Sequence, residues 1–278
     1  MTPAVLDRPV VDQGTVERET SPLAYISTSR LKSFLTCRLR FFFEKVLGLP
    51  SPSSPNLQIG KAVHAGLQRY HKSLFRDEED ASEEAVIASY REAYLKLEAE
   101  DPVAYKDDGH RQKSVDAGER VLKAYLADPG SADIKPLGVE VWLRREAGLL
   151  ALPLVGIVDL VLDRNLTVDF KTIGSTPNPE QEAWQHEGQL VAYHLLIEEA
   201  TGEPSGGSEL AWLVKSKTPK IIRHQMPPAT DLQIDRLRAL VDVYAEAVER
   251  EDYYPSVGMH CSWCSFKAEC STWKGGSK

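Results

Sequence analysis

Apolar residues recur every three or four positions through the first half of the chain, which is the spacing of one helix face. The first such run starts at Ser27, a good N-cap residue, and Gly48 and Pro50 end it. Further helices are predicted over residues 57–75, 82–100 and 112–127. The first 130 residues are therefore expected to be mostly helical.

The pattern changes near Leu137, where apolar and polar residues begin to alternate as they do in strands. Two apolar runs, 152–162 and 166–170, flank Asp163-Arg164-Asn165 and predict a hairpin. The later elements are expected to be a helix over 179–199, strands over 209–214 and 220–226, and a helix over 231–250. This order predicts an α/β fold, with a mixed central sheet flanked by helices and a helical N-terminal elaboration.

The register of this hairpin decides whether two aspartates meet. Side chains alternate between the faces of a strand, so Asp169 and Lys171 point the same way. If the numbers of paired residues sum to 328, Asp159 lies directly opposite Asp169, whereas a sum of 329 would place Phe170 there. A three-residue loop, with Asn165 in the left-handed conformation, gives the first register, and we predict that loop.

Two carboxylates beside a lysine suit metal-assisted hydrolysis, because the acids can hold a hard divalent cation and the lysine can orient or deprotonate the attacking water. The alternative is an exposed hairpin with scattered charges. The metal site is favoured because Asp159 and Asp169 interrupt apolar strands, where an unpaired carboxylate is costly to bury. Glu140 could be a further metal neighbour, but an edge-facing or salt-bridged glutamate is the stronger expectation.

Composition limits the class of protein. With 278 residues, of which 42% are hydrophobic and 27% charged, the chain can bury a substantial core. No apolar run approaches the ~20 residues of a membrane span, and the N-terminus lacks a signal pattern, so we expect a cytoplasmic protein. Residues 1–22 are expected to be a disordered lead-in and residues 274–278 a flexible tail.

The net charge of −8 argues against a nonspecific polycationic coat on DNA, but its distribution is uneven. Residues 21–75 hold eight Lys or Arg against one acid, Glu44. Such a stretch is often only solvated surface, but it can also bind phosphates. The candidate DNA contacts are Arg30, Arg38 and Arg40 in the first helix and Lys215 and Lys217 in a later loop.

Four cysteines form two groups: Cys37 stands alone in the first helix, and Cys261, Cys264 and Cys270 lie close together near the C-terminus. In a cytosolic protein this spacing indicates metal binding rather than disulfides. Four thiolates suit zinc or a [4Fe-4S] cluster, and the spacing alone leaves both open.

The order Gly156-x-x-Asp159 and then Asp169-Phe170-Lys171 resembles the core motif of the PD-(D/E)xK nucleases, in the branch typified by the RecB nuclease domain and the CRISPR-associated adaptation exonucleases. The segment from Gly60 to His64 is similar to the histidine motif of that branch.

Two further motifs extend the resemblance from about Tyr25 to Trp273. The pair Gln189-x-x-x-Tyr193 is similar to the family motif that borders the active site and contacts DNA. The four cysteines resemble the iron-sulfur staple of the same branch, although Arg38 follows Cys37 where the family usually has proline.

The resemblance implies a restriction-endonuclease-like core within a single nuclease domain, residues 23–273. Its parts would be a mostly helical segment (23–130), the α/β nuclease core (137–250) and an Fe-S cysteine segment (255–273). It implies that His64, Asp159, Asp169 and the Phe170 backbone carbonyl bind Mg²⁺ or Mn²⁺. Lys171 would position the water, Gln189 and Tyr193 would organise the site or the strand, and the cysteines would hold a [4Fe-4S] cluster.

The leading hypothesis is a metal-dependent DNA exonuclease that acts on DNA ends or single strands in recombination or DNA processing. The same chemistry could serve spacer processing in CRISPR adaptation. The competing hypothesis is a non-catalytic DNA-end-binding subunit of a helicase-nuclease, recombination or CRISPR adaptation complex. It is disfavoured because every metal and lysine position holds a competent residue type. The sequence has no G-x-x-x-x-G-K-[ST] motif, so unwinding would have to come from a partner or from frayed ends.

Overall fold

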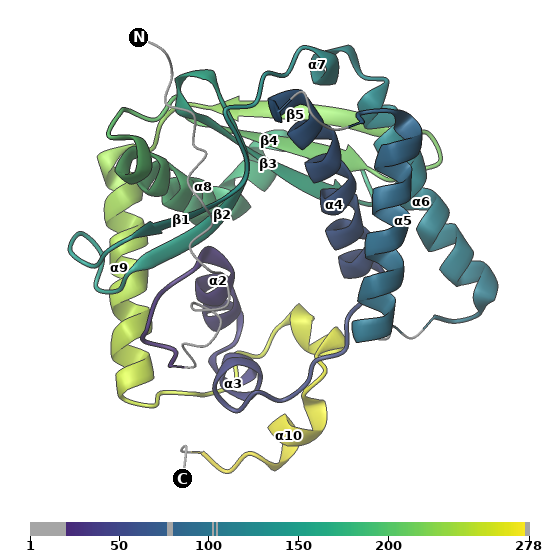
Figure 1. The fold of residues 1–278 in the computed structure, drawn as a ribbon. Helices are drawn as coiled ribbons and strands as arrows, with labels where there is room; N and C mark the ends of the chain where they lie inside the picture. The colour runs from purple at the N-terminus through teal and green to yellow at the C-terminus, as the bar shows by residue number, and fades with distance from the viewer. Residues whose placement is uncertain (1–20, 77–79, 102, 104, 276–278) are drawn as a thin grey trace.

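The computed structural model describes residues 21–76, 80–101, 103 and 105–275 (Figure 1). The predicted lead-in, residues 1–22, lies almost wholly outside the described residues, as do the last three residues of the predicted tail, 274–278. Among the helices that are described, none is long and apolar enough to cross a membrane.

Within the described residues, five strands form one sheet in the order β1-β2-β3-β4-β5. They are β1 (Gly138–Arg145), β2 (Leu154–Leu162), β3 (Leu166–Ile173), β4 (Ser208–Val214) and β5 (Lys220–Met226). All neighbours are antiparallel except β3 and β4, which are parallel. The fold class predicted from the sequence, a mixed central sheet flanked by helices, is confirmed.

The parallel pair needs a crossover, and α8 (Pro179–Thr201) supplies it between β3 and β4. The ends of α8 are set by local chemistry. Asn178 caps its start by accepting a hydrogen bond from the Gln181 N–H, and Gly202, at φ 70, ends it in the left-handed conformation.

Helices cover both faces of the sheet (Figure 1). On one face lie α4 (Pro55–Arg76), α5 (Glu83–Glu100) and α6 (Asp108–Leu126), followed by the short α7 (Pro129–Ala132). On the other face, α8 packs with α2 (Thr28–Thr36) and α9 (Asp231–Glu249). Because both faces are covered, every residue of the interior strand β4 is buried.

The first helix does not continue to Gly48 as the sequence predicts. It is interrupted at Cys37, whose backbone is extended (φ −162, ψ 111), and resumes as α3 (Arg38–Phe41) and η1 (Phe42–Val46). The interruption brings Cys37 to the C-terminal segment, where the Ser256 N–H donates to its Sγ at 3.5 Å. Figure 1 shows α3 and the C-terminal α10 (Lys267–Thr272) side by side, with η3 (Met259–Trp263) leading into α10.

The central hairpin has the predicted register. Leu160 pairs with Val168 and Leu162 with Leu166, so paired numbers sum to 328. The connection is the three-residue turn η2 (Asp163–Asn165), and Asn165 is left-handed at φ 58 as predicted. Arg164 is also left-handed, at φ 55, which the sequence did not predict.

Candidate active site

The site forms where the hairpin stops pairing. The last paired residues are Leu160 and Val168, and the register places Asp159 opposite Asp169 just beyond them. There the Phe170 N–H donates to Oδ2 of Asp159 at 2.8 Å instead of to a strand carbonyl. The Asp159 carboxylate is therefore fixed between the two strands, with its second oxygen available to another group.

Asp169 is almost completely buried, at 3% exposure, and three side chains hold it. Its Oδ1 accepts hydrogen bonds from Gln189 Nε2 at 2.8 Å and from the Tyr193 hydroxyl at 3.3 Å. Its Oδ2 lies 2.7 Å from Lys171 Nζ, which also donates to Gln189 Oε1 at 3.1 Å. Burial raises the pKa of Asp169, Lys171 opposes that effect, and Asp159 adds to it. Gln189 thus fixes the lysine and the carboxylate relative to each other.

Gly156 explains how α8 comes close enough to make these contacts. A Cβ at this position of β2 would lie 2.8 Å from Cδ1 of Leu196, which is fully buried, and 3.6 Å from the Tyr193 ring. The absence of a side chain therefore lets the helix that carries Gln189 and Tyr193 pack against the sheet.

His64 approaches from α4, as the sequence predicts. Its Nε2 donates to the Phe170 carbonyl at 3.0 Å, and its Nδ1 lies 3.4 Å from Asp159 Oδ1. Burial lowers the pKa of His64, but the nearby Asp159 and Glu140 carboxylates outweigh it and raise the pKa to about 9. The imidazole is therefore held at the point where negative charge accumulates.

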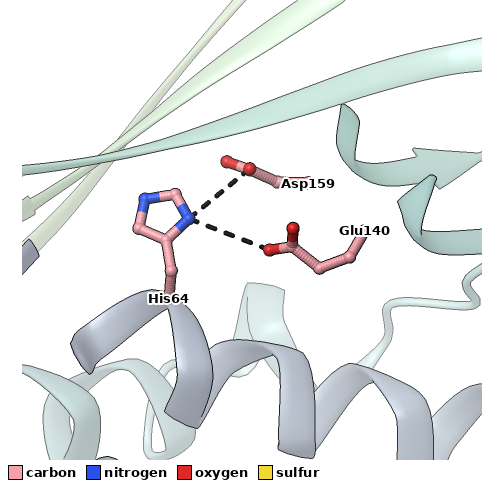
Figure 2. A group of neighbouring side chains, drawn as sticks. All are labelled: His64, Glu140 and Asp159. Atoms are coloured by element: carbon pink, nitrogen blue, oxygen red, sulfur yellow. Dashed lines mark ion pairs between the residues drawn. The ribbon is translucent and has the colours of Figure 1, made fainter. Parts of the chain in front are cut away.

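Glu140 belongs to this cluster. The sequence favoured an edge-facing or salt-bridged glutamate, and the structure does pair Glu140 with a base, but that base is His64 of the site, with Oε1 at 4.0 Å from Nδ1. Figure 2 shows the same imidazole nitrogen facing both Glu140 and Asp159. Burial and Asp159 raise the pKa of Glu140 to about 7, with His64 and Lys72 opposing the shift.

The donor set fits a divalent cation. In the part of the chain that the structure describes, His64, Glu140 and Asp159 form the one group of three or more His, Cys, Asp or Glu whose ligand atoms all lie within 4.8 Å of one another. Carboxylate oxygens suit Mg²⁺ and Mn²⁺, and an imidazole nitrogen is compatible with transition metals such as Mn²⁺. The Phe170 carbonyl, the further ligand implied by the resemblance, accepts the His64 hydrogen bond.

Two basic residues near the site, Lys32 and His186, are not assigned to it by the sequence. Lys32 of α2 lies close enough to His186 that, after burial and Lys171, it helps to lower the His186 pKa to about 4. His186 precedes Gln189 by three positions on α8, so helical spacing alone could have placed it near the site. Nothing local in the sequence places Lys32 there, because α2 and α8 meet only through the fold.

The residues predicted to contact DNA differ in exposure and in their contacts within the protein. Arg30 donates to the Tyr25 carbonyl at 2.9 Å, and Arg38 lies over the Phe34 and Tyr254 rings, so both have structural contacts within the protein. Arg40 lies 3.7 Å from Glu44. Lys215 is half-buried, which lowers its pKa, and Lys217 is exposed.

The four cysteines line one cavity of about 220 Å³ between α3 and the C-terminal segment. All four are free thiols. The N–H groups of Ser256 and Gly258 donate to Sγ of Cys37 and of Cys261, each at 3.5 Å. Burial raises the pKa of the Cys270 thiol, and the other three thiols add to this. Among the described residues, no three of these sulfurs lie within 4.8 Å of one another.

A family model described as the PD-(D/E)XK nuclease superfamily matches residues 25–271 of the chain. A solved structure from Eubacterium rectale, provisionally described as an exonuclease, has a similar fold, with a TM-score of 0.65 at 15% identity over 98% of this chain and 96% of that one. The structure of SSO0001 gives a TM-score of only 0.36, at 16% identity over 84% of this chain and 94% of that one. A comparison with curated proteins gives no match.

Proposed function

Because the chain belongs to the PD-(D/E)XK nuclease superfamily, we propose that it is a metal-dependent DNA exonuclease that hydrolyses phosphodiester bonds at DNA ends or in single strands. The observation that carries this proposal is the grouping of Asp169, Lys171 and Gln189 on one side of Asp159, with His64 on the other. The exonuclease description of the Eubacterium rectale protein, which has a similar fold, is consistent with it.

In this proposal, His64, Asp159 and Asp169 bind Mg²⁺ or Mn²⁺, and the Phe170 carbonyl remains a predicted ligand. A divalent ion at such a site polarises the phosphate and lowers the pKa of a bound water. Lys171 would orient the attacking water or help to deprotonate it. The contact between Lys171 Nζ and Asp169 Oδ2, at 2.7 Å, keeps the lysine beside the metal-binding carboxylate.

Gln189 and Tyr193 act as positioning residues. Gln189 Nε2 donates both to Asp169 and, at 2.7 Å, to the Tyr193 hydroxyl, while Gln189 Oε1 accepts from Lys171. The neutral side chain of Gln189 on α8 therefore holds both charged groups, the Asp169 carboxylate and the Lys171 ammonium. Electrostatic catalysis of this kind depends on groups that need not reorganise during the reaction.

We also propose that Cys37, Cys261, Cys264 and Cys270 hold a [4Fe-4S] cluster. The four thiols line one cavity, and two of them accept backbone N–H groups, which is a common way to stabilise cluster sulfurs. The layout of one cysteine near the start of the chain and three near its end resembles the iron-sulfur staple of the RecB-like branch, which favours the cluster over a single zinc ion.

The test is cleavage of end-labelled single-stranded and double-stranded DNA by anaerobically purified full-length protein with Mn²⁺. Shortening from an end that requires Mn²⁺ and is lost in Asp169→Asn supports the proposal. Asp235→Asn is a matched control, because Asp235 is an exposed acid that pairs with Arg238 on α9. Binding of DNA ends without cleavage would instead support the alternative, a non-catalytic subunit of a helicase-nuclease or CRISPR adaptation complex.

A further inference from the structure

Glu140 has an unusual backbone for a residue in a strand. Its neighbours keep one register with β2, since Val139 pairs with Leu160 and Val141 with Val158. That register would place Glu140 opposite Asp159 in a regular ladder. Instead, Glu140 adopts a φ of 51, in the left-handed region that residues with a side chain seldom occupy. Strained conformations of this kind persist only where the surroundings impose them, and they cluster at functional sites.

This conformation places the Glu140 carboxylate at the imidazole of His64. Its Oε1 lies 4.0 Å from Nδ1, and Asp159 Oδ1 lies 3.4 Å from the same atom (Figure 2). Two carboxylates therefore converge on one nitrogen. A protonated imidazole carries one positive charge and can balance only one of them, whereas a divalent cation balances both.

The other nitrogen of His64 is already used. Its Nε2 donates to the Phe170 carbonyl at 3.0 Å, which leaves Nδ1 as the nitrogen that faces the carboxylates. Metal-binding histidines usually donate their second ring N–H to a carboxylate or a backbone carbonyl in this way, which fixes the ring orientation. The Phe170 carbonyl is thus well placed to orient His64 toward a cation.

From these observations we infer that Glu140 is itself a ligand of the catalytic metal ion, bound together with Nδ1 of His64 and with Asp159. The inference deepens the proposed nuclease function and rests on it. It adds β1 to the strands that build the site, so that the neighbouring strands β1, β2 and β3 each contribute a carboxylate, from Glu140, Asp159 and Asp169.

The experiment measures Mn²⁺ affinity rather than cleavage. Full-length protein, purified anaerobically, is titrated with Mn²⁺ by calorimetry, with free Mn²⁺ followed by electron paramagnetic resonance. Glu140→Gln removes the charge at nearly constant shape, and Glu140→Gly removes the side chain and the constraint on φ. Both variants are expected to bind Mn²⁺ at least tenfold more weakly than the unmodified protein. Glu146→Gln, at an exposed acid paired with Arg144, should bind it unchanged.

Melting temperatures measured with and without Mn²⁺ show whether Glu140 binds the metal or only supports the fold. Without Mn²⁺, both Glu140 variants should melt at the same temperature as the unmodified protein or higher, because a carboxylate is removed from beside Asp159 and the glycine relieves the backbone. Added Mn²⁺ should then raise their melting temperature less. Wild-type Mn²⁺ affinity in Glu140→Gln and Glu140→Gly would overturn the inference.

The two proposals fail separately. If cleavage depends on Asp169 and Lys171 while Glu140→Gln binds Mn²⁺ normally, the nuclease stands and the role of Glu140 is wrong. If the Glu140 variants lose Mn²⁺ affinity but the unmodified protein cleaves no DNA, the metal ligand stands and the nuclease proposal is wrong.

Discussion

Asp159 and Phe170 are joined across two strands, with the carboxylate of one accepting the backbone N–H of the other at 2.8 Å. The same aspartate presents its second oxygen to His64 at 3.4 Å. Asp159 therefore has two separable roles, since it completes the hydrogen bonding of β3 and it offers a negative charge to a cation.

Substitutions at Asp159 should separate these roles. Asp159→Asn keeps an oxygen that can accept the Phe170 N–H, so its free energy of unfolding without metal should stay close to that of the unmodified protein. Asp159→Ala leaves this N–H unpaired and should cost about 1–2 kcal/mol of stability. Both should lose Mn²⁺-dependent cleavage. Urea unfolding in EDTA and DNA cleavage assays measure the two effects, and equal stabilities of the two variants would contradict the structural role.

Asp169→Ala and Lys171→Ala should abolish cleavage while leaving DNA binding and the cluster largely intact. Asp169 is assigned to the metal and Lys171 to the water, whereas the proposed phosphate contacts lie elsewhere. Loss of a group that moves or orients a proton typically costs about 10²–10⁴-fold in rate. Single-turnover cleavage and fluorescence anisotropy with labelled DNA measure rate and binding separately. Near wild-type turnover in Lys171→Ala would remove its assigned role.

Cys264→Ser should remove the proposed cluster and much of the stability. The cysteine cavity lies between α3 and the C-terminal segment, so a cluster bound there would link the two. The free energy of binding such a metal centre adds directly to the free energy of folding. The anaerobic unmodified protein should be brown, contain iron and sulfide, and melt well above the variant. A colourless anaerobic preparation with one equivalent of zinc would contradict the cluster.

The hairpin and its register could be predicted because the evidence for them is local. Alternation of apolar residues fixes which face each side chain takes, and a three-residue turn fixes the pairing. The pairing of Leu160 with Val168 follows the predicted register. The pairing ends before Asp159, however, and the two aspartates contact helices on opposite faces of the sheet: Asp159 lies beside His64 of α4, and Asp169 accepts hydrogen bonds from Gln189 and Tyr193 of α8.

Glu140 could not be placed in the same way. The connection from β1 to β2 spans residues 146–153, too long to set a register from turn chemistry alone. The left-handed φ of Glu140 has no sequence signal either, since such residues are commonly Gly, Asn or Asp.

The interruption at Cys37 shows a different limit. Apolar residues keep helical spacing on both sides of it, so periodicity predicts one continuous helix. Contacts with the C-terminal segment, including the Ser256 N–H, lie 219 positions away in the chain. Tertiary contacts of this kind override local propensity.

His71 lies beneath the site and should lower the stability of the protein in acid. Its ring is 1% exposed, stacks on Phe170 at 5.5 Å between centroids, and its Nε2 pairs with the Tyr125 hydroxyl at 2.9 Å. Burial, and then the positive charge of Arg223, lower its pKa to about 3 despite the opposing charge of Asp159. The histidine is therefore neutral in the folded protein at every pH above about 3.

Below about pH 6.5 the unfolded chain takes up a proton at His71 while the folded protein does not, so acid favours unfolding. Stability should fall from pH 6.5 toward pH 3, and the His71 contribution at pH 4.5 is on the order of 2–3 kcal/mol.

His71→Gln keeps a polar partner for Tyr125 but does not titrate. Urea unfolding should therefore show that the free energy of unfolding falls less between pH 7.5 and pH 4.5 in His71→Gln than in the unmodified protein. His186→Gln should reduce that fall less, because His186 is only partly buried and solvent screens its charged form. If the free energy of unfolding fell equally in His71→Gln and in the unmodified protein, His71 would not stay neutral when folded.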